Sequence, residues 1–250
     1  MSGHSKWSQI KRQKGANDAK RGATFTKIAR EISIAAREGG GDPDANYRLR
    51  LAVEKARSVN MPADNIKRAI DRATGGGAAE QYEEIIYEGY GPGGVAILVE
   101  AATDNRNRTV ADVRSLFTKA GGQLAGSGSV AWQFEPRGVV AVSPDGRDPD
   151  EIALAAIDAG AQDVDVEGDP LEIITEPGSL EGVRKALESA GVSIESAEIT
   201  MQPKNAVAVD QTVVRQNLRL IEALEDLDDV QRVTANFDLP EEILAEAASA

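Results

Sequence analysis

The chain has 250 residues, a formal charge of −13, no cysteine and one histidine, His4. These numbers exclude disulfides, thiolate nucleophiles and zinc–thiolate sites, and they leave little for a Ser-His-Asp triad or a His-rich metal site. Carboxylate and magnesium chemistry stays open. The length and the 41% of hydrophobic residues are typical of a globular protein of two or three domains.

No apolar run is long enough to cross a bilayer. We therefore expect a cytoplasmic protein that has no membrane partner and no cofactor. The first 17 residues contain no acid, so a mitochondrial transit peptide is the rival interpretation of this segment.

The charge is divided unevenly along the chain. Residues 1–75 hold 16 basic and eight acidic side chains, a net of +8, whereas residues 76–250 hold 12 and 33, a net of −21. Such asymmetry indicates nucleic acid or another anionic surface as a partner. The alternative is a solvated basic tail of no special role. Because the basic bias continues into predicted helices, we favour the binding interpretation.

The first part of the chain predicts a basic tail followed by three helices. Residues 1–22 are polar and basic, and we expect them to be flexible in isolation. A helix is predicted from Thr24, as its N-cap, to the glycines at 39–41. A second helix follows the start signal Asp42-Pro43, and a third covers 61–73. Seven basic side chains decorate the second and third helices: Arg48, Arg50, Lys55, Arg57, Lys67, Arg68 and Arg72.

The residue pattern in the middle of the chain changes from helical to strands and turns. Residues 83–105 predict two strands around a Gly-Pro-Gly-Gly turn, and a helix is expected from Thr109 to Ala120. Residues 121–129 predict a loop and 129–135 another strand. The segment GSGSVA lacks the third glycine of a dinucleotide loop and leads into that strand, so a plain loop is the better interpretation.

Residues 136–203 predict the order strand-helix-strand-strand-helix-strand, which is that of a ferredoxin-like domain. The last part predicts a helix at 211–227 and a strand at 229–238. These two elements complete the middle domain, so the ferredoxin-like domain is expected to be inserted into it. The expected fold class is α+β with three domains, a helical N-terminal domain and two mixed α/β domains. Their predicted limits are 1–78, 79–135 with 204–240, and 136–203.

The segment TDNRNRT, residues 103–109, follows a buried strand and leads into a helix. Thr109 and Asp112 form a capping-box pattern, which places Arg106 and Arg108 beside a helix N-terminus. Free N–H groups and the helix dipole favour an anion there. The residues therefore indicate either a phosphate-binding corner or a polar turn whose arginines pair with nearby acids. The segment DLDD at 226–229 is interpreted as a solvated helix end.

The basic tail is the main candidate for nucleic-acid binding. Its Lys and Arg side chains surround Trp7, and basic groups neutralise phosphates while an aromatic ring can stack on a base. About six phosphate contacts to a duplex would give a slope of roughly −5 for log affinity against log salt. No helix-turn-helix spacing, zinc-finger pattern or aromatic RNP motif is present. The predicted nucleic-acid contacts are Lys6, Trp7, Lys11, Arg12, Lys14, Lys20, Arg21, Lys27, Asn105, Arg106, Asn107 and Arg108.

Several segments together resemble the YebC/PmpR family. They are MSGHSKWSQIKRQK, KRGATFTKIAREI, NMPADNIKRAI, YEGYGPGG, TDNRNRT and GSVAWQFEPRG, in the family's order over nearly the full chain. The resemblance implies a three-domain α/β protein with one domain inserted. It also implies a non-enzymatic cytoplasmic regulator. Members of the family are described as transcriptional regulators that bind DNA, and related mitochondrial members as translational activators at the ribosome.

Two functions are therefore expected. The first is a DNA-binding transcriptional regulatory protein. The alternative is a ribosome-associated translation factor that binds ribosomal RNA or tRNA and relieves stalls at difficult sequences. The acidic remainder repels a DNA duplex, which favours the alternative on physical grounds. A magnesium-dependent nuclease is a third, weaker hypothesis, and the protein is expected to be a monomer.

Overall fold

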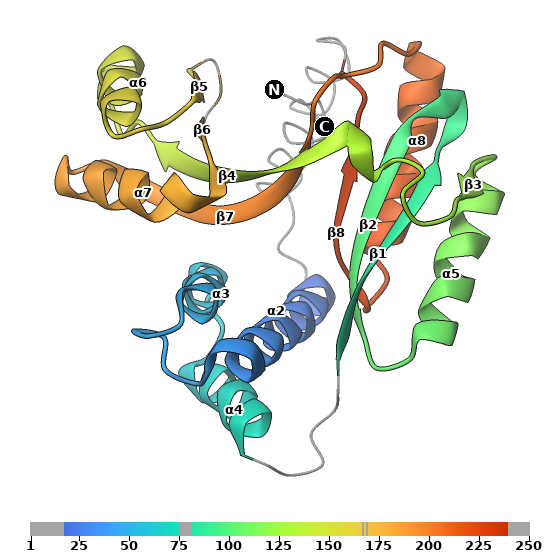
Figure 1. Ribbon diagram of the computed structural model, residues 1–250, viewed down its shortest axis with the longest axis horizontal. Coiled ribbons are helices and arrows are strands. Elements are labelled where there is room, and N and C mark those ends of the chain that lie inside the picture. The colour runs from blue at the N-terminus through green and yellow to red at the C-terminus, as the bar shows by residue number, and fades with distance from the viewer. Residues whose placement is uncertain (1–17, 76–81, 167, 169, 240–250) are drawn as a thin grey trace. The chain divides into compact units, whose positions relative to one another are not determined.

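The structure is a computed structural model that describes residues 18–75, 82–166, 168 and 170–239, with side chains from residue 22 onward. The chain forms two compact units (Figure 1). The first comprises the described residues of 1–56, 61–135 and 203–250, and the second comprises 57–60 and the described residues of 136–202. The protein is mixed α/β, with a helical N-terminal part followed by two antiparallel sheets. The limits of three domains stay a prediction.

The first helix, α2, runs from Asp18 to Gly39. The prediction that it begins at Thr24 is wrong, because Thr24 lies inside the helix. Residues 18–21 are Asp-Ala-Lys-Arg, and Ala, Lys and Arg are strong helix formers. The Thr26 hydroxyl donates to the Gly22 carbonyl at 3.1 Å, one turn back along this extension. The part of the predicted flexible tail from Asp18 onward is therefore helical.

The helix α3, Tyr47–Ser58, is capped by Asn46 and not by Asp42. The Asn46 Oδ1 accepts the Leu49 N–H at 3.1 Å, while its Nδ2 donates to the Ala35 and Gly40 carbonyls at 2.7 and 2.8 Å. Asp42 instead accepts from the Asp44 N–H within the preceding turn. Buried Asn46 thus ties the end of α2 to the start of α3.

The helix α4, Ala63–Thr74, packs against α2. Its buried positions Ile66 and Ala69 lie three residues apart, as an amphipathic helix requires. The Ser33 hydroxyl of α2 bonds the Ala29 carbonyl at 2.8 Å and reaches the Ala69 carbonyl of α4 at 3.4 Å. Small side chains at this crossing let the two backbones approach closely.

The sheet of the first unit has the order β3-β1-β2-β8, and its neighbours are antiparallel. The predicted Gly-Pro-Gly-Gly hairpin is confirmed: β1 and β2 pair along their whole length, and the Gly91 N–H donates to the Val95 carbonyl at 2.8 Å. Gly93 in this turn has φ of +72°, which suits glycine. The strands are β1 (Glu83–Tyr90), β2 (Ala96–Thr103), β3 (Gln123–Leu124) and β8 (Val230–Ala235).

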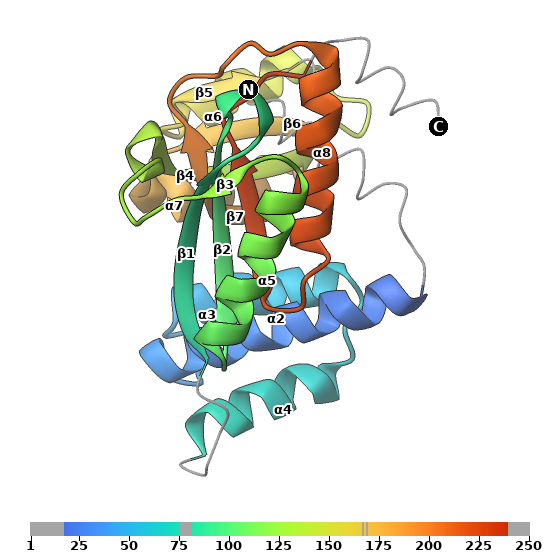
Figure 2. The same ribbon diagram turned by 90° about the vertical axis from the view of Figure 1, so that its right-hand side faces the viewer.

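Two helices, α5 (Arg106–Lys119) and α8 (Gln211–Glu225), lie on the same face of this sheet (Figure 2). Fully buried Phe117 of α5 and Ile221 of α8 join the side chains of β1 and β2 in one hydrophobic core. The helix α5 begins at Arg106, so the prediction of a start at Thr109 is wrong. Asn105 is the N-cap, because its side chain accepts the Arg108 N–H at 3.1 Å.

The second unit has a sheet of order β5-β6-β4-β7, in which β6 pairs antiparallel with both β4 and β5. With helices after the first and third strands, this is the predicted ferredoxin-like arrangement, inserted between β3 and α8 of the first unit. Its elements are β4 (Phe134–Ser143), α6 (Pro149–Asp158), β5 (Asp163–Asp165), β6 (Leu171–Thr175), α7 (Leu180–Ser189) and β7 (Ser193–Pro203).

The prediction of a separate strand at 129–135 is wrong. A bend at 129–130 and a short 3-10 turn at Ala131–Gln133 replace its first five residues, and β4 then runs without a break from Phe134. The cause is buried Glu88, whose carboxylate accepts the N–H groups of Gly128, Val130 and Ala131 at 2.6 to 2.8 Å. These bonds curl the backbone around the carboxylate and leave no extended ladder to form.

No helix among the described residues has the length and apolar character that crossing a membrane requires. The described residues also contain no cluster of three or more side chains suited to holding a metal ion.

Candidate nucleic-acid interface

Most of the predicted contacts in the basic tail lie outside the described residues. Lys6, Trp7, Lys11, Arg12 and Lys14 precede Asp18, where the description begins. Lys20 and Arg21 belong to α2, but their side chains are not described. Their role as nucleic-acid contacts stays a prediction.

Lys27 lies on α2 with its ammonium group turned to the end of α8. Its Nζ donates to the Glu225 carbonyl, the last residue of that helix, where the helix dipole favours a cation. Burial lowers the pKa of Lys27, and the nearby carboxylates of Glu225 and Asp226 oppose that effect only in part. The side chain is half-buried. Lys27 therefore anchors α2 to the α/β part of the first unit.

The side chains of the 105–108 segment have different surroundings. Asn105 serves as the N-cap of α5 and donates its own N–H to the Thr103 hydroxyl at 2.9 Å. Arg106 is 67% exposed and lies 3.6 Å from Glu83, a distance typical of a loose surface ion pair. Asn107 is exposed. Arg106 and Asn107 are thus accessible to a ligand, whereas Asn105 shapes the backbone.

Arg108 is the member of this segment that the protein itself engages. Its Nη2 donates to Asp104 at 2.8 Å and to the Asp229 carboxylate at 2.8 and 3.1 Å. The hydrogen bonds to Asp229 and Asp104 raise the pKa of Arg108. This is the arrangement of the second interpretation, a turn whose arginines pair with nearby acids.

Asp229 is buried and is the centre of a larger network. Besides Arg108, its carboxylate accepts from the Thr109 hydroxyl at 2.7 Å and the Thr103 hydroxyl at 3.1 Å, and it pairs with Arg30 of α2 at 3.0 Å. The prediction that this acidic segment is a solvated helix end is therefore wrong for Asp229. The network joins α2, the end of β2, the start of α5 and the start of β8 through one carboxylate.

The pKa of Asp229 lies below its ordinary value. Burial alone raises it, but hydrogen bonds from Arg108 and Thr109 and the charge of Arg30 outweigh burial. The pKa of Glu88 is also lowered, because hydrogen bonds from three backbone N–H groups outweigh the effect of its burial. Both carboxylates are accordingly ionised at neutral pH.

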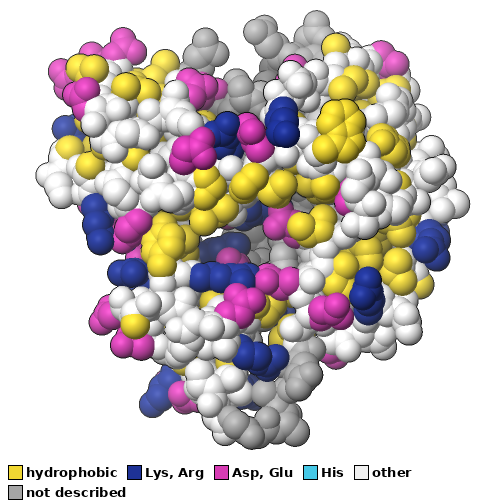
Figure 3. Space-filling view, viewed as in Figure 1, with side chains coloured by type: hydrophobic (Ala, Val, Ile, Leu, Met, Phe, Trp, Pro, Cys, Tyr) yellow, Lys and Arg dark blue, Asp and Glu magenta, His cyan; other side chains and the backbone are white. Residues whose placement is uncertain are grey.

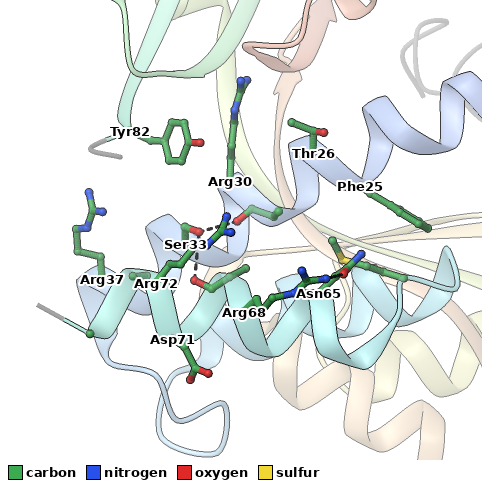
Figure 4. A pocket seen from close by; sticks show the side chains of 15 residues that line it. Phe25, Thr26, Arg30, Ser33, Arg37, Asn65, Arg68, Asp71, Arg72 and Tyr82 are labelled. Atoms are coloured by element: carbon green, nitrogen blue, oxygen red, sulfur yellow. Dashed lines mark hydrogen bonds between the residues drawn. The ribbon is translucent and has the colours of Figure 1, made fainter. Parts of the chain in front are cut away.

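A groove of about 860 Å³ lies between α2 and α4, with Tyr82 at its edge (Figure 4). Figure 4 shows Phe25 and Asn65 at one end of the groove and Tyr82 and Arg37 at the other. Among the described lining residues there are four arginines and one carboxylate, that of Asp71. The arginines are Arg30, Arg37, Arg68 and Arg72. The groove is thus a basic hollow in the helical part of the chain.

The basic side chains of α3 and α4 have different surroundings. Two of those on α3 form ion pairs: Arg48 binds Glu38 and Glu84, and Lys55 binds Glu31 at 2.8 Å. In the lower part of Figure 3, over the helices, blue side chains accordingly stand beside magenta ones. The set on α4 differs, because no ion pair within the described residues involves Lys67, Arg68 or Arg72.

Arg68 and Arg72 are exposed and lie four residues apart on α4, so they project from the same side of that helix. Both line the groove. Arg68 bonds to Asn65 and to the Asp64 carbonyl, contacts that steady its guanidinium without neutralising it. Positive charge held in this way suits a phosphate ligand.

Sequence reasoning missed Arg30, Arg37, Arg68 and Arg72 as site residues. The i,i+4 spacing of the α4 pair on the polar face of an amphipathic helix was the available signal. Asp229 was missed because nothing in DLDD distinguishes a buried aspartate from the solvated ones beside it.

Comparison with known proteins identifies the family. Residues 5–76 match the family domain described as "TACO1/YebC protein N-terminal domain", and residues 82–237 match "TACO1/YebC second and third domain". These matches together cover most of the 250 residues. The chain belongs to the TACO1/YebC family, as the resemblance of its motifs predicted.

Curated relatives and a solved structure agree with this assignment. A protein of Rubrobacter xylanophilus is 58% identical over 99% of this chain and 100% of its own length, and one of Chloroflexus aggregans is 57% identical over 98% of both. Both carry the name "Probable transcriptional regulatory protein". The crystal structure of a conserved hypothetical protein, Aq1575, from Aquifex aeolicus has a TM-score of 0.85 and 48% identity, covering 91% of this chain and 94% of that one.

Proposed function

We propose that this protein is a non-enzymatic regulator of gene expression that binds DNA through its basic helical part. The observation that carries the proposal is the groove between α2 and α4, where the exposed Arg68 and Arg72 have no ion-pair partner among the described residues and Asp71 is the one lining carboxylate. The names of the relatives support a role in transcriptional regulation.

The distribution of charge limits where DNA can make contact. Residues 1–75 carry a net +8, whereas the remainder carries −21 and repels a polyanion. Contact is therefore confined to the helical part, with the basic tail, Arg68 and Arg72 as the phosphate-binding groups. Lys and Arg that neutralise phosphates release counterions, so binding must weaken as salt rises.

Salt-dependent binding tests this assignment. The variant Arg68→Ala/Arg72→Ala should bind duplex DNA more weakly, and the slope of log affinity against log salt should become shallower by about 2. The control Arg114→Ala/Arg219→Ala removes two exposed arginines of α5 and α8 and the same total charge. Equal losses in both variants would show that only net charge matters and would contradict the proposal.

Crosslinking in cells, followed by sequencing of the recovered nucleic acid, tests the ligand. Enrichment of a few promoter fragments is expected for a transcriptional regulator. Ribosomal RNA clustered at one place would overturn DNA as the ligand and assign the protein to translation instead. Magnesium-dependent cleavage of the bound nucleic acid by the pure protein would contradict the non-enzymatic part of the proposal.

A further inference from the structure

The groove between α2 and α4 is a hollow, whereas phosphate contacts need only a surface. Its volume of about 860 Å³ falls in the range of roughly 300–1,000 Å³ typical of small-molecule sites. Four of the residues that line the groove have small side chains. They are Ala29, Ser33, Ala69 and Ala73. A phosphate backbone running over the rim would leave this space unfilled.

Aromatic rings line the two ends of the hollow. Tyr82 lies at one end with the Arg30 guanidinium 5.3 Å from its ring centre, and Phe25 lies at the other (Figure 4). Both rings are only partly buried. Aromatic rings and arginine planes are the groups on which unstacked bases rest in single-strand-binding proteins.

Charge and aromatic character are arranged side by side. Arg68 and Arg72 come from the exposed side of α4, while Tyr82 enters from the start of the α/β part. A phosphate bound by the two arginines would place its own base at the mouth of the hollow. The Ser33 hydroxyl and the Asn65 amide add groups that can hydrogen-bond a base edge.

We propose that this groove binds one unpaired nucleotide, with the base inside beside Tyr82 and the phosphate at Arg68 and Arg72. The inference rests on the proposed nucleic-acid function and specifies its ligand. A base within a duplex can enter only after it leaves the stack, which costs free energy. The groove therefore favours a single strand over a duplex. Base and phosphate are common to DNA and RNA, so the ligand class is single-stranded nucleic acid.

A short single-stranded DNA with one 2-aminopurine, its duplex, and the matching RNA strand are the probes. The wild-type protein should bind the single strand more tightly than the duplex, and the fluorescence of 2-aminopurine should change on binding. The variant Tyr82→Leu should lose about tenfold in single-strand affinity, because stacking is lost, while Tyr82→Phe keeps it. The DNA and RNA strands together show which sugar the site prefers.

Filling the hollow separates this inference from simple charge attraction. The substitution Ala73→Leu adds bulk to the groove at little cost in helix propensity, and Ala111→Leu on exposed α5 is its control. The filled variant should lose the preference for single strands and the fluorescence change, yet keep its duplex affinity. If Ala73→Leu lowers the melting temperature, Ala29→Leu on α2 is the second variant that fills the groove.

The inference is overturned if both filled variants keep the single-strand preference and the fluorescence change. In that case duplex binding that still depends on Arg68 and Arg72 would leave the proposed function standing. If the wild-type protein binds neither strand nor duplex, the proposed function and the inference fail together.

Discussion

Two regions of the first unit hold arginines in similar numbers and use them differently. At the start of α5, Arg108 is bound to the buried carboxylate of Asp229, and Arg30 of α2 reaches the same group. On α4, Arg68 and Arg72 are exposed at the rim of a groove, and no carboxylate within the described chain pairs with them. The first set stabilises the fold, whereas the second is available to a ligand.

The difference lies in the acids and not in the arginines. Asp229 is desolvated, and its negative charge is tolerated only because two arginines and two hydroxyl groups surround it. Arg108 and Arg30 are therefore held at the Asp229 carboxylate. The α4 arginines are exposed to solvent and neutralise no buried acid. An arginine is therefore a good candidate for ligand binding where the protein offers it no buried partner.

The largest expected effect is on stability at Asp229. Replacing Asp229 with Ala leaves Arg30 mostly buried without its carboxylate and should lower the free energy of unfolding by about 3 kcal/mol. Denaturant unfolding measures this loss. The exposed Asp238→Ala is the control, and a similar small change in both variants would break the comparison.

The pH dependence of stability sharpens the same point. Because the pKa of Asp229 is lowered in the folded state, its contribution is present above the unfolded value of about 3.9 and disappears as the pH falls through the folded value. The difference in unfolding free energy between the wild type and Asp229→Asn should therefore shrink below about pH 4. A difference that stays constant from neutral to acid pH would contradict the assignment.

Intermediate and small effects are expected at the two arginines of α5. Arg108→Ala should lower the melting temperature clearly, because Asp229 stays buried while both of its oxygens lose the hydrogen bond from Arg108 Nη2. Arg106→Ala removes only a loose, exposed pair with Glu83 and should cost less than about 1 kcal/mol. Thermal unfolding of the two variants under the same conditions compares them. Equal melting temperatures would show that Arg108 is no more structural than Arg106.

Much of the fold could be predicted from local patterns. The Gly-Pro-Gly-Gly hairpin, the helix at 211–225 and the ferredoxin-like order follow from turn residues, capping side chains and hydrophobic periodicity. Errors arose where distant residues decide the local structure. Hydrogen bonds from the 128–131 backbone to buried Glu88 replace the start of the strand that was predicted at 129–135.

The candidate site was harder to predict for the same reason. The choice between a phosphate-binding corner and paired arginines at 103–109 depends on Asp229, which is 121 residues from Arg108. The groove depends on how α2 and α4 cross, and on Tyr82, which follows both helices in the chain. Residue spacing within one segment cannot predict contacts between segments that are far apart in the chain.

The central claim is that the α4 arginines bind the ligand while Arg108 holds the fold. Nucleic-acid affinity and melting temperature of Arg72→Ala and Arg108→Ala, measured side by side at a temperature where both are folded, test it most directly. Arg72→Ala should weaken binding and reduce the salt slope by about 1 while its melting temperature stays that of the wild type. Arg108→Ala should melt earlier and bind with unchanged affinity and salt slope. The reverse pattern, lost affinity in Arg108→Ala and lost stability in Arg72→Ala, would contradict the account.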